Sequence, residues 1–190
     1  MKKLLLVGAG GFGRVVLEHA RNDYDCAFVD DGYEKGAEIC GIKVVGKLDD
    51  LVNLYPEYNL ISVTIGNNAL RGKVYSRAIQ IGYDFPNIIG QNVYISPYAS
   101  IGTGCVLLNN VTIQNGSKVG SGIILNPGVE IHHDSEVGDY SLIYTNSVIR
   151  TYARIGKRVK IGSNVSISNE AIVEDDSIIE DGAVITKDWR

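Results

Sequence analysis

Aliphatic side chains recur at every sixth position through the second half of the chain. From Ile89 to Ile185, each residue in this register is Ile, Leu or Val, without an exception. The residue two places earlier is usually small or β-branched, as at Cys105, Ser117 and Ala153. An α-helix repeats every 3.6 residues and a β-strand every two, so neither gives this spacing over such a length. The pattern is that of the hexapeptide repeat of a parallel β-helix.

A triangular coil accounts for the repeat if each flat side takes six residues and ends in a corner. The aliphatic side chain then points inward, and three sides make a coil of about 18 residues. No insertion interrupts the register, so we expect no long loop to leave the prism. We expect the glycines that follow the aliphatic residue to supply the positive φ angles of sharp corners. These glycines are Gly90, Gly102, Gly120, Gly138, Gly156 and Gly162.

The segment before the repeat has a different pattern of residues. This difference predicts two domains, a small α/β domain at 1–86 and the β-helix at 87–190. An apolar run at 2–7 predicts a buried strand, and Gly8, Gly10 and Gly13 follow it. We expect strands also at 26–29, 44–45 and 60–65, with helices at 12–21, 48–55 and 69–80. About four parallel strands make a Rossmann-like half-domain, too short for a complete dinucleotide fold.

The glycine loop of this domain predicts a nucleotide site. A G-x-G-x-x-G between a strand and a helix places phosphates at the helix N-terminus, and a carboxylate about 20 residues later can bind a ribose hydroxyl. Asp30, Asp31 and Asn67 fall at the carboxyl ends of predicted strands, where open α/β sheets bind ligands. The sequence therefore favours a nucleotide or a nucleotide-sugar over NAD(P). The alternative is a purely structural glycine turn.

Composition narrows the classes of partner and compartment. The net charge of −4 gives no reason to expect binding to nucleic acid or to an anionic membrane. The three cysteines form a sparse, odd set that suits a reducing cytoplasm. The N-terminal apolar run ends at Gly8, too soon for a signal peptide, and no stretch is long and apolar enough to span a bilayer. We therefore expect a cytoplasmic protein without membrane insertion.

Candidate chemistry lies just after Ile131, where the chain reads His132-His133-Asp134. Because Ile131 points inward, the following residues cross the outer face of the coil. An imidazole can act as a general base near neutral pH, and a carboxylate can orient it and fix its tautomer. Metal binding is the rival interpretation. Adjacent histidines project in different directions and no cysteine cluster accompanies them, so no metal is expected.

At this point the chain resembles a family, the bacterial sugar acyltransferases of the sialic-acid O-acetyltransferase and bacillosamine-pathway N-acetyltransferase type. The resemblance covers nearly the whole chain and is carried by residues 7–13, 28–31, 65–68, 122–126 and 133–134. It implies a left-handed β-helix and acetyl transfer from acetyl-CoA to a hydroxyl or amine of a sugar, often the 4-amino group of a UDP-linked deoxysugar. It also implies a homotrimer whose active sites lie between neighbouring β-helices, and a role in surface-polysaccharide or glycoconjugate synthesis.

The resemblance assigns roles to individual residues. His133 would be the general base, Asp134 the acid that orients it, and Asn126 a contact to the sugar. Leu142 and Thr151 stand where the family carries a second His and a Gly beside CoA, so they mark the acyl-donor (cofactor) site. The uridine-diphosphate site would be lined by Gly10, Gly11, Phe12, Asp30, Asp31, Gly66 and Asn67, with Phe12 in place of the family's usual His.

These departures, together with the missing Gly-x-Pro-Ala segment that closes the family's chains, leave two other functions open. One is a nucleotide-sugar-binding scaffold that has lost catalysis. The other is an acyltransferase for a different small molecule, such as an amino acid hydroxyl.

Overall fold

The chain folds as two compact units, Met1–Ile88 and a second that begins at Ile89. The structure is a computed structural model that describes residues 1–189. The start of the six-residue repeat predicts a domain boundary at 86/87, two residues earlier. No helix within residues 1–189 combines the length and the apolar character that crossing a bilayer requires.

The first unit is an α/β layer built on a five-stranded sheet, in the order β3-β4-β2-β1-β5. Strand β1 lies parallel to β2 and β5, and β4 extends the parallel part of the sheet beside β2. Helix α1 packs on β1 and β2, whereas α3 packs on β5 and contacts α2. The elements are β1 (Lys2–Val7), α1 (Gly11–Ala20), β2 (Tyr24–Val29), β3 (Glu38–Ile39), β4 (Ile42–Gly46), a 3-10 turn (Leu48–Asp50), α2 (Leu51–Leu54), β5 (Leu60–Val63) and α3 (Asn68–Ile81).

The four parallel strands agree with the sequence prediction, but β3 was not predicted. It forms a two-residue antiparallel hairpin with β4. The turn is made by Cys40 and Gly41, both with positive φ, of 51° and 76°. A turn of this kind usually contains Asn or Asp before Gly, so Cys40-Gly41 gave no recognisable hairpin signal.

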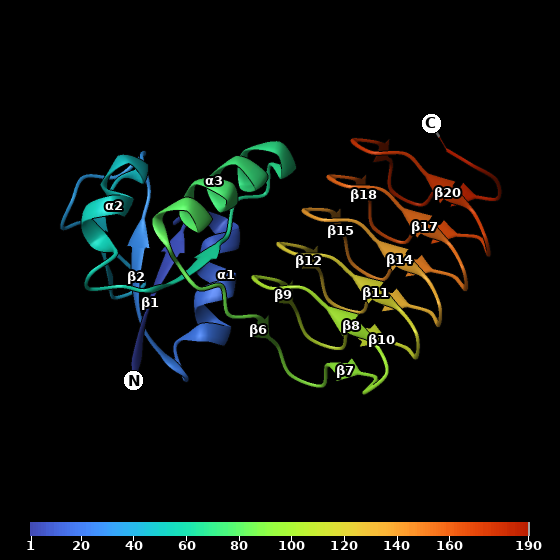
Figure 1. Cartoon of the computed structure of the whole chain (residues 1–190), viewed down its shortest axis with the longest axis horizontal. Coiled ribbons are helices and arrows are strands. Elements are labelled where there is room, and N and C mark those ends of the chain that lie inside the picture. The colour runs from blue at the N-terminus through green and yellow to red at the C-terminus, as the bar shows by residue number, and fades with distance from the viewer. Residues whose placement is uncertain (190) are drawn as a thin grey trace. The chain divides into compact units, whose positions relative to one another are not determined.

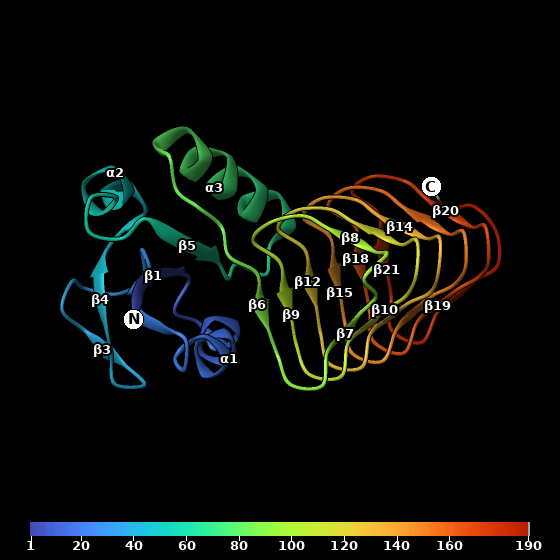
Figure 2. The ribbon, with the colours of Figure 1, turned by 60° about the horizontal axis from the view of Figure 1, so that its bottom comes forward.

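The second unit is the parallel β-helix, whose coils stack from β6 toward the C-terminal end (Figure 1). Figure 2 shows successive windings overlying one another with no loop leaving the stack, as the unbroken register predicts. Each of the three sides is a parallel sheet of two-residue strands, named below by its first strand. The β6 sheet contains β6 (Ile88–Ile89), β9 (Val106–Leu107), β12 (Ile124–Leu125), β15 (Leu142–Ile143), β18 (Lys160–Ile161) and β21 (Ile178–Ile179). The β7 sheet contains β7 (Tyr94–Ile95), β10 (Thr112–Ile113), β13 (Glu130–Ile131), β16 (Val148–Ile149), β19 (Ser166–Ile167) and β22 (Val184–Ile185). The β8 sheet contains β8 (Ser100–Ile101), β11 (Lys118–Val119), β14 (Glu136–Val137), β17 (Arg154–Ile155) and β20 (Ile172–Val173).

The core of the prism consists of the aliphatic residues in the six-residue register and the small residues before them. Ile131 and Ile149 are fully buried, and so are the small inward residues Cys105 and Ser141. The buried Ser141 hydroxyl donates to the carbonyl of Gly156 (3.0 Å), which satisfies it without water. Ile89 departs from the prediction, because 48% of its surface is exposed. It begins the first coil, and no preceding coil of the stack can cover it.

The predicted reason for the corner glycines is wrong. Left-handed backbone occurs not at the residue directly after the aliphatic side chain but three residues after it, as at Asp134 (φ 60°) and Asn146 (φ 58°). The glycines directly after the aliphatic residue are needed for space instead. A Cβ on Gly120 or Gly156 would lie 2.5 Å from a carboxylate oxygen of the next coil, Asp139 or Asp175.

Each of these two carboxylates connects its coil to the preceding coil. Asp139 accepts a hydrogen bond from the backbone N–H of Ser121 (3.0 Å), and Asp175 accepts one from Lys157 N–H (2.7 Å). In both cases donor and acceptor residues are 18 positions apart, one coil. Each side-chain oxygen fills the space that the glycine leaves open. The corner therefore satisfies a backbone donor that no strand can pair.

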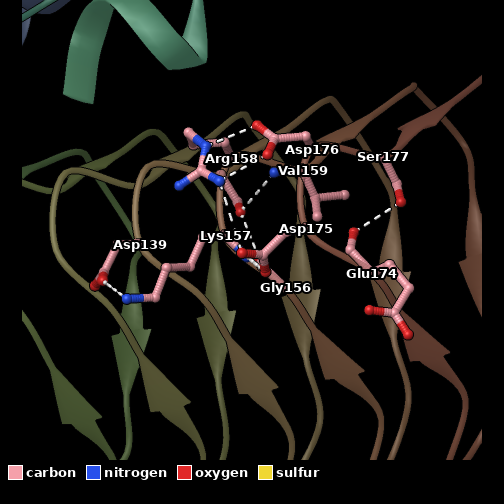
Figure 3. A network of polar contacts seen from close by, with 10 residues as sticks. Asp139, Gly156, Lys157, Arg158, Val159, Glu174, Asp175, Asp176 and Ser177 are labelled. Carbon is pink, nitrogen blue, oxygen red and sulfur yellow. Dashed lines mark hydrogen bonds and ion pairs between the residues drawn. The ribbon is translucent and has the colours of Figure 1, made fainter. Parts of the chain in front are cut away.

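Oppositely charged side chains reinforce the corner that follows the β8 sheet (Figure 3). Lys157 Nζ lies 3.0 Å from Asp139 Oδ2. Arg158 binds Asp176 through two parallel hydrogen bonds of 2.7 and 2.6 Å. Partial burial raises the pKa of Asp139, but hydrogen bonds from Ser121 N–H and Lys157 outweigh it and hold that pKa below its ordinary value of 3.8.

We expect Gly138→Ala to lower the free energy of unfolding by about 1–3 kcal/mol, because an added Cβ would overlap the neighbouring coil. It would lie 2.6 Å from the backbone carbon of Gly156. Gly66→Ala is the control, since nothing lies within 4 Å of a Cβ at that position. Chemical denaturation of the three proteins measures the difference. Equal stability of Gly138→Ala and wild type would contradict the close approach of the coils.

We expect Asp139→Asn to be less stable than wild type at pH 7 and the difference to shrink below about pH 4. The lowered pKa means that folding favours the ionised carboxylate, so its stabilisation is present above the unfolded-state pKa of 3.8 and is lost as the pH falls through the folded-state value. Denaturation at pH 7, 5, 4 and 3 measures this. Glu180→Gln, an exposed carboxylate of the same unit, is the control. A difference that stays constant to pH 3 would show that charge is not the cause.

Candidate active site

The corner between β13 and β14 presents His132, His133 and Asp134 to solvent. Ile131 before them and Ser135 after them are both fully buried, so the inward positions fix where the corner begins and ends. Asp134 takes the left-handed conformation that this corner position requires. The structure thus places the predicted His-acid pair on the outer surface, as the six-residue register indicates.

The imidazole of His133 is in contact with side chains at both of its nitrogens. Nδ1 lies 2.8 Å from Asp134 Oδ2, and Nε2 lies 3.2 Å from Thr151 Oγ1. An ionised carboxylate can only accept, so in the neutral imidazole the proton is on Nδ1 and Nε2 carries the lone pair. The Thr151 hydroxyl then donates to Nε2. His133 N–H donates to Gln114 Oε1 (3.1 Å), and half of the His133 side chain is exposed.

The neighbouring histidine has different partners. His132 Nε2 lies 3.2 Å from Glu130 Oε2, and the His132 carbonyl accepts hydrogen bonds from the Ser117 and Ser135 hydroxyls. The two imidazoles therefore do not converge. Within residues 1–189, no three His, Cys, Asp or Glu side chains are grouped so that they could hold a metal ion.

The other residues assigned to the sugar and the acyl donor lie at different places on the prism. Asn126 follows β12, at the corner between the β6 and β7 sheets, and its Nδ2 donates to the carbonyl of Ile143 (3.2 Å). Leu142 lies in β15 and is only 4% exposed. Of these residues, only Thr151 adjoins His133, because it occupies the same corner one coil further on.

A shallow cavity of about 370 Å³ lies on the outer face of the β8 sheet. One of its strands is β14, which follows directly on the His133 corner. Lys118 and Arg154 give it positive charge, while Glu136 pairs with Lys118 at 2.9 Å. Gly120, Gly138 and Gly156 line it without side chains. Sequence reasoning missed this groove, since it treated these glycines only as corner residues.

The glycine loop of the first unit is held in place by side chains of the neighbouring strands. Asp30 accepts hydrogen bonds from Ala9 N–H and Gly32 N–H, both at 2.7 Å. Gly13 cannot be any other residue, because its Cβ would lie 1.8 Å from the Gly8 carbonyl oxygen. Above this loop there is open space, since nothing lies within 4 Å of a Cβ on Gly10.

The remaining predicted residues of this unit surround the same strand ends. Asp31 accepts a hydrogen bond from Leu48 N–H (2.8 Å). Asn67 caps α3 by accepting from Leu70 N–H (2.9 Å). Gly66 also faces open space, whereas Gly11 and Phe12 form the first turn of α1.

Two residues that sequence reasoning missed fix the loops of this unit. Thr64 Oγ1 donates to the carbonyls of both Val7 (2.9 Å) and Gly8 (2.8 Å), which ties β5 to the glycine loop. The guanidinium of Arg71 is buried and donates to the Ile65 carbonyl (2.7 Å). Neither residue stands in a recognisable motif, so only the folded geometry identifies them.

Comparison with known proteins identifies the family. Residues 3–78 match the family described as PglD N-terminal domain, and residues 89–188 match that described as GMPPB C-terminal domain. The acetyltransferase domain of PglB from Neisseria gonorrhoeae FA1090, in complex with acetyl coenzyme A, is 31% identical, with a TM-score of 0.93 over 99% of this chain and 92% of that one. This chain belongs to the bacillosamine-type sugar acetyltransferase family. The family resemblance seen in the sequence is therefore confirmed, and so is the prediction of a left-handed β-helix. The predicted enzyme class, an acyltransferase, is that of this family.

More distant structures share the fold of this acetyltransferase. PerB from Caulobacter crescentus, in complex with CoA and GDP-perosamine, has a TM-score of 0.75 at 23% identity over 100% of this chain and 91% of that one. WeeI from Acinetobacter baumannii AYE has a TM-score of 0.80 at 21% identity over 99% and 96%. At this identity the likeness concerns the fold alone.

Proposed function

We propose that this protein transfers the acetyl group of acetyl-CoA to an amino or hydroxyl group of a nucleotide-linked sugar, with His133 as the general base. The preferred acceptor is a UDP-linked 4-amino-deoxysugar. The observation that carries the proposal is the pairing of His133 Nδ1 with Asp134 at 2.8 Å, which leaves the lone pair on the outward Nε2. Family membership supplies the reaction class to which this base is suited.

The proposed step needs no group beyond these residues and the two substrates. The acceptor nitrogen or oxygen attacks the thioester carbonyl carbon while Nε2 takes its proton. The tetrahedral intermediate collapses with cleavage of the carbon–sulfur bond, and the imidazolium returns the proton to the CoA thiolate. Asp134 stabilises the imidazolium formed between these events. Once the acceptor occupies Nε2, the Thr151 hydroxyl is released and can donate to the thioester oxygen as it becomes negative.

The donor and the nucleotide are proposed to use the surfaces described above. The groove on the β8 sheet begins beside the His133 corner, and its Lys118 and Arg154 side chains suit the phosphates of CoA. The glycine loop, with Gly10, Gly66 and the loop-holding Asp30, is proposed to receive the nucleotide. The three free cysteines accord with a proposed cytoplasmic location, where they would stay reduced.

We also propose that the active protein is a homotrimer. Asn126 and His133 follow strands of two different sheets, so they stand at different corners of the same coil. A site that uses both residues needs Asn126 from one copy and His133 from another. An assembly with the β-helices side by side would supply such sites in a closed ring.

We expect His133→Ala to lower kcat by about 10²–10⁴-fold and Asp134→Asn to lower it less, because the imidazole loses its base or only its orienting partner. CoA release, followed with a thiol reagent, measures this with acetyl-CoA and UDP-4-amino-deoxysugars. His132→Ala is the matched control and should keep wild-type turnover, since His132 pairs with Glu130 instead.

Full turnover by His133→Ala would show that His133 is not the general base. No turnover by wild type, with tight binding of the UDP-sugar, would favour a binding scaffold instead. If uridine nucleotides fail to stabilise the fold, the acceptor is a different small molecule.

We expect His133→Ala and Asn126→Ala each to be inactive when refolded alone. When the two variants are unfolded together and refolded as mixed trimers, the mixture should recover activity. If each site takes these residues from two copies, about a quarter of the sites in a one-to-one mixture combine both intact residues. CoA release by the mixture, compared with each variant refolded alone, measures the recovery. Absence of recovery in trimers shown to be mixed would place both residues in the same subunit's site.

A further inference from the structure

The backbone conformation at the corners of the β-helix determines which residue types the fold favours there. The third corner residue has a left-handed backbone along nearly the whole stack, with φ between 55° and 73°. Such angles favour Gly, and next Asn and Asp, because other side chains clash with the backbone. Most of the described corners obey this preference, with Asn92, Gly104, Asn110, Gly116, Gly122, Gly128, Asp134, Asn146, Asn164, Asp176 and Gly182 at this position.

Tyr152 breaks this preference at the coil that covers His133. It has a φ of 62°, and 54% of its surface is exposed. Packing in the core therefore does not offset the free-energy cost of this backbone conformation. Three other described corners also depart from it, at Tyr140, Arg158 and Glu170; of these, Arg158 binds Asp176 through two hydrogen bonds. The ring of Tyr152 instead stands edge-on to the imidazole of His133, with ring centroids 6.0 Å apart and planes at 81°.

We propose that Tyr152 is a specificity-determining residue that receives the ring of the acceptor sugar beside His133. The inference rests on the proposed function, because it takes Nε2 as the proton acceptor. The group that loses its proton to Nε2 is attached directly to the sugar ring. An aromatic ring beside the same imidazole therefore adjoins that sugar.

The chemistry of the two rings is complementary. A hexose presents C–H bonds on its faces, and a deoxysugar adds a methyl group; both pack well on an aromatic surface. Thr151, the preceding residue, occupies Nε2, so two consecutive residues of one coil contact the base and its surroundings. Asn at position 152 would suit the backbone better but would remove the apolar surface.

The test compares Tyr152→Asn with wild type, with Tyr152→Phe and with the matched control Tyr140→Asn. Tyr140 has the same left-handed backbone (φ 60°), but at a corner after the β8 sheet. Both Asn variants should raise Tm by about 2–4 °C, because they relieve the same strain. Only Tyr152→Asn should lower kcat/KM for the acceptor sugar, by roughly ten- to a hundredfold, with KM for acetyl-CoA unchanged. Tyr152→Phe retains the aromatic ring and should therefore lose much less acceptor kcat/KM than Tyr152→Asn.

Each departure from this pattern has a separate meaning. Unchanged acceptor kcat/KM in Tyr152→Asn overturns the proposal, and so does an equal loss in Tyr140→Asn. A rise in KM for acetyl-CoA alone would assign Tyr152 to the donor, and a lower Tm would make it a structural residue; either result also overturns it. Failure of wild type to release CoA with any nucleotide-sugar would instead refute the proposed function.

Discussion

The close stacking of coils is the constraint on which the rest of the β-helix depends. Successive coils approach so closely that a Cβ on Gly120 or Gly156 would overlap an oxygen of the next coil. At this separation, a corner side chain reaches the corner 18 residues away, as Asp139 and Asp175 do. The backbone donors of the corners are satisfied by this route, as Asp139 and Asp175 show. A functional group on the outer surface can therefore draw on its own corner and on corners one coil away, as His133 does with Asp134 and Thr151.

His133 is assembled under this constraint, but with a different set of partners. Thr151, one coil further on, does not accept from the His133 backbone as Asp139 and Asp175 do for their neighbours. Its hydroxyl lies against the imidazole instead, and His133 N–H finds its acceptor in Gln114, on the preceding coil. Because of these different hydrogen-bond partners, this corner positions a general base, whereas the corners of Asp139 and Asp175 stabilise the stack of coils. Local rules that fail while a fold stays intact are often found at functional sites.

The register of the sequence was sufficient to predict the prism and to separate His133 and Asp134 from the inward residues. It could not predict what lies beside the imidazole, because contacts between coils depend on side-chain direction as well as spacing. The assignment of the corner glycines to positive φ was wrong for a related reason: glycine serves both close approach and left-handed backbone, and composition alone does not distinguish them. In the first unit, Asp30 was predicted at a strand end, yet its role in holding Ala9 and Gly32 became visible only in the fold. Thr64 and Arg71 carried no sequence signal at all.

The coil length has a consequence for how this chain can change over generations. Insertion of a complete 18-residue coil would preserve every inward position and every corner, and would only lengthen the prism. Loss of a single residue between His133 and Thr151 would instead bring Tyr152 over the imidazole and turn the inward aliphatic side chains of that coil outward. Variation by whole coils is thus compatible with the fold outside the interval from His133 to Tyr152, whereas insertions and deletions inside that interval would separate the base from its partners.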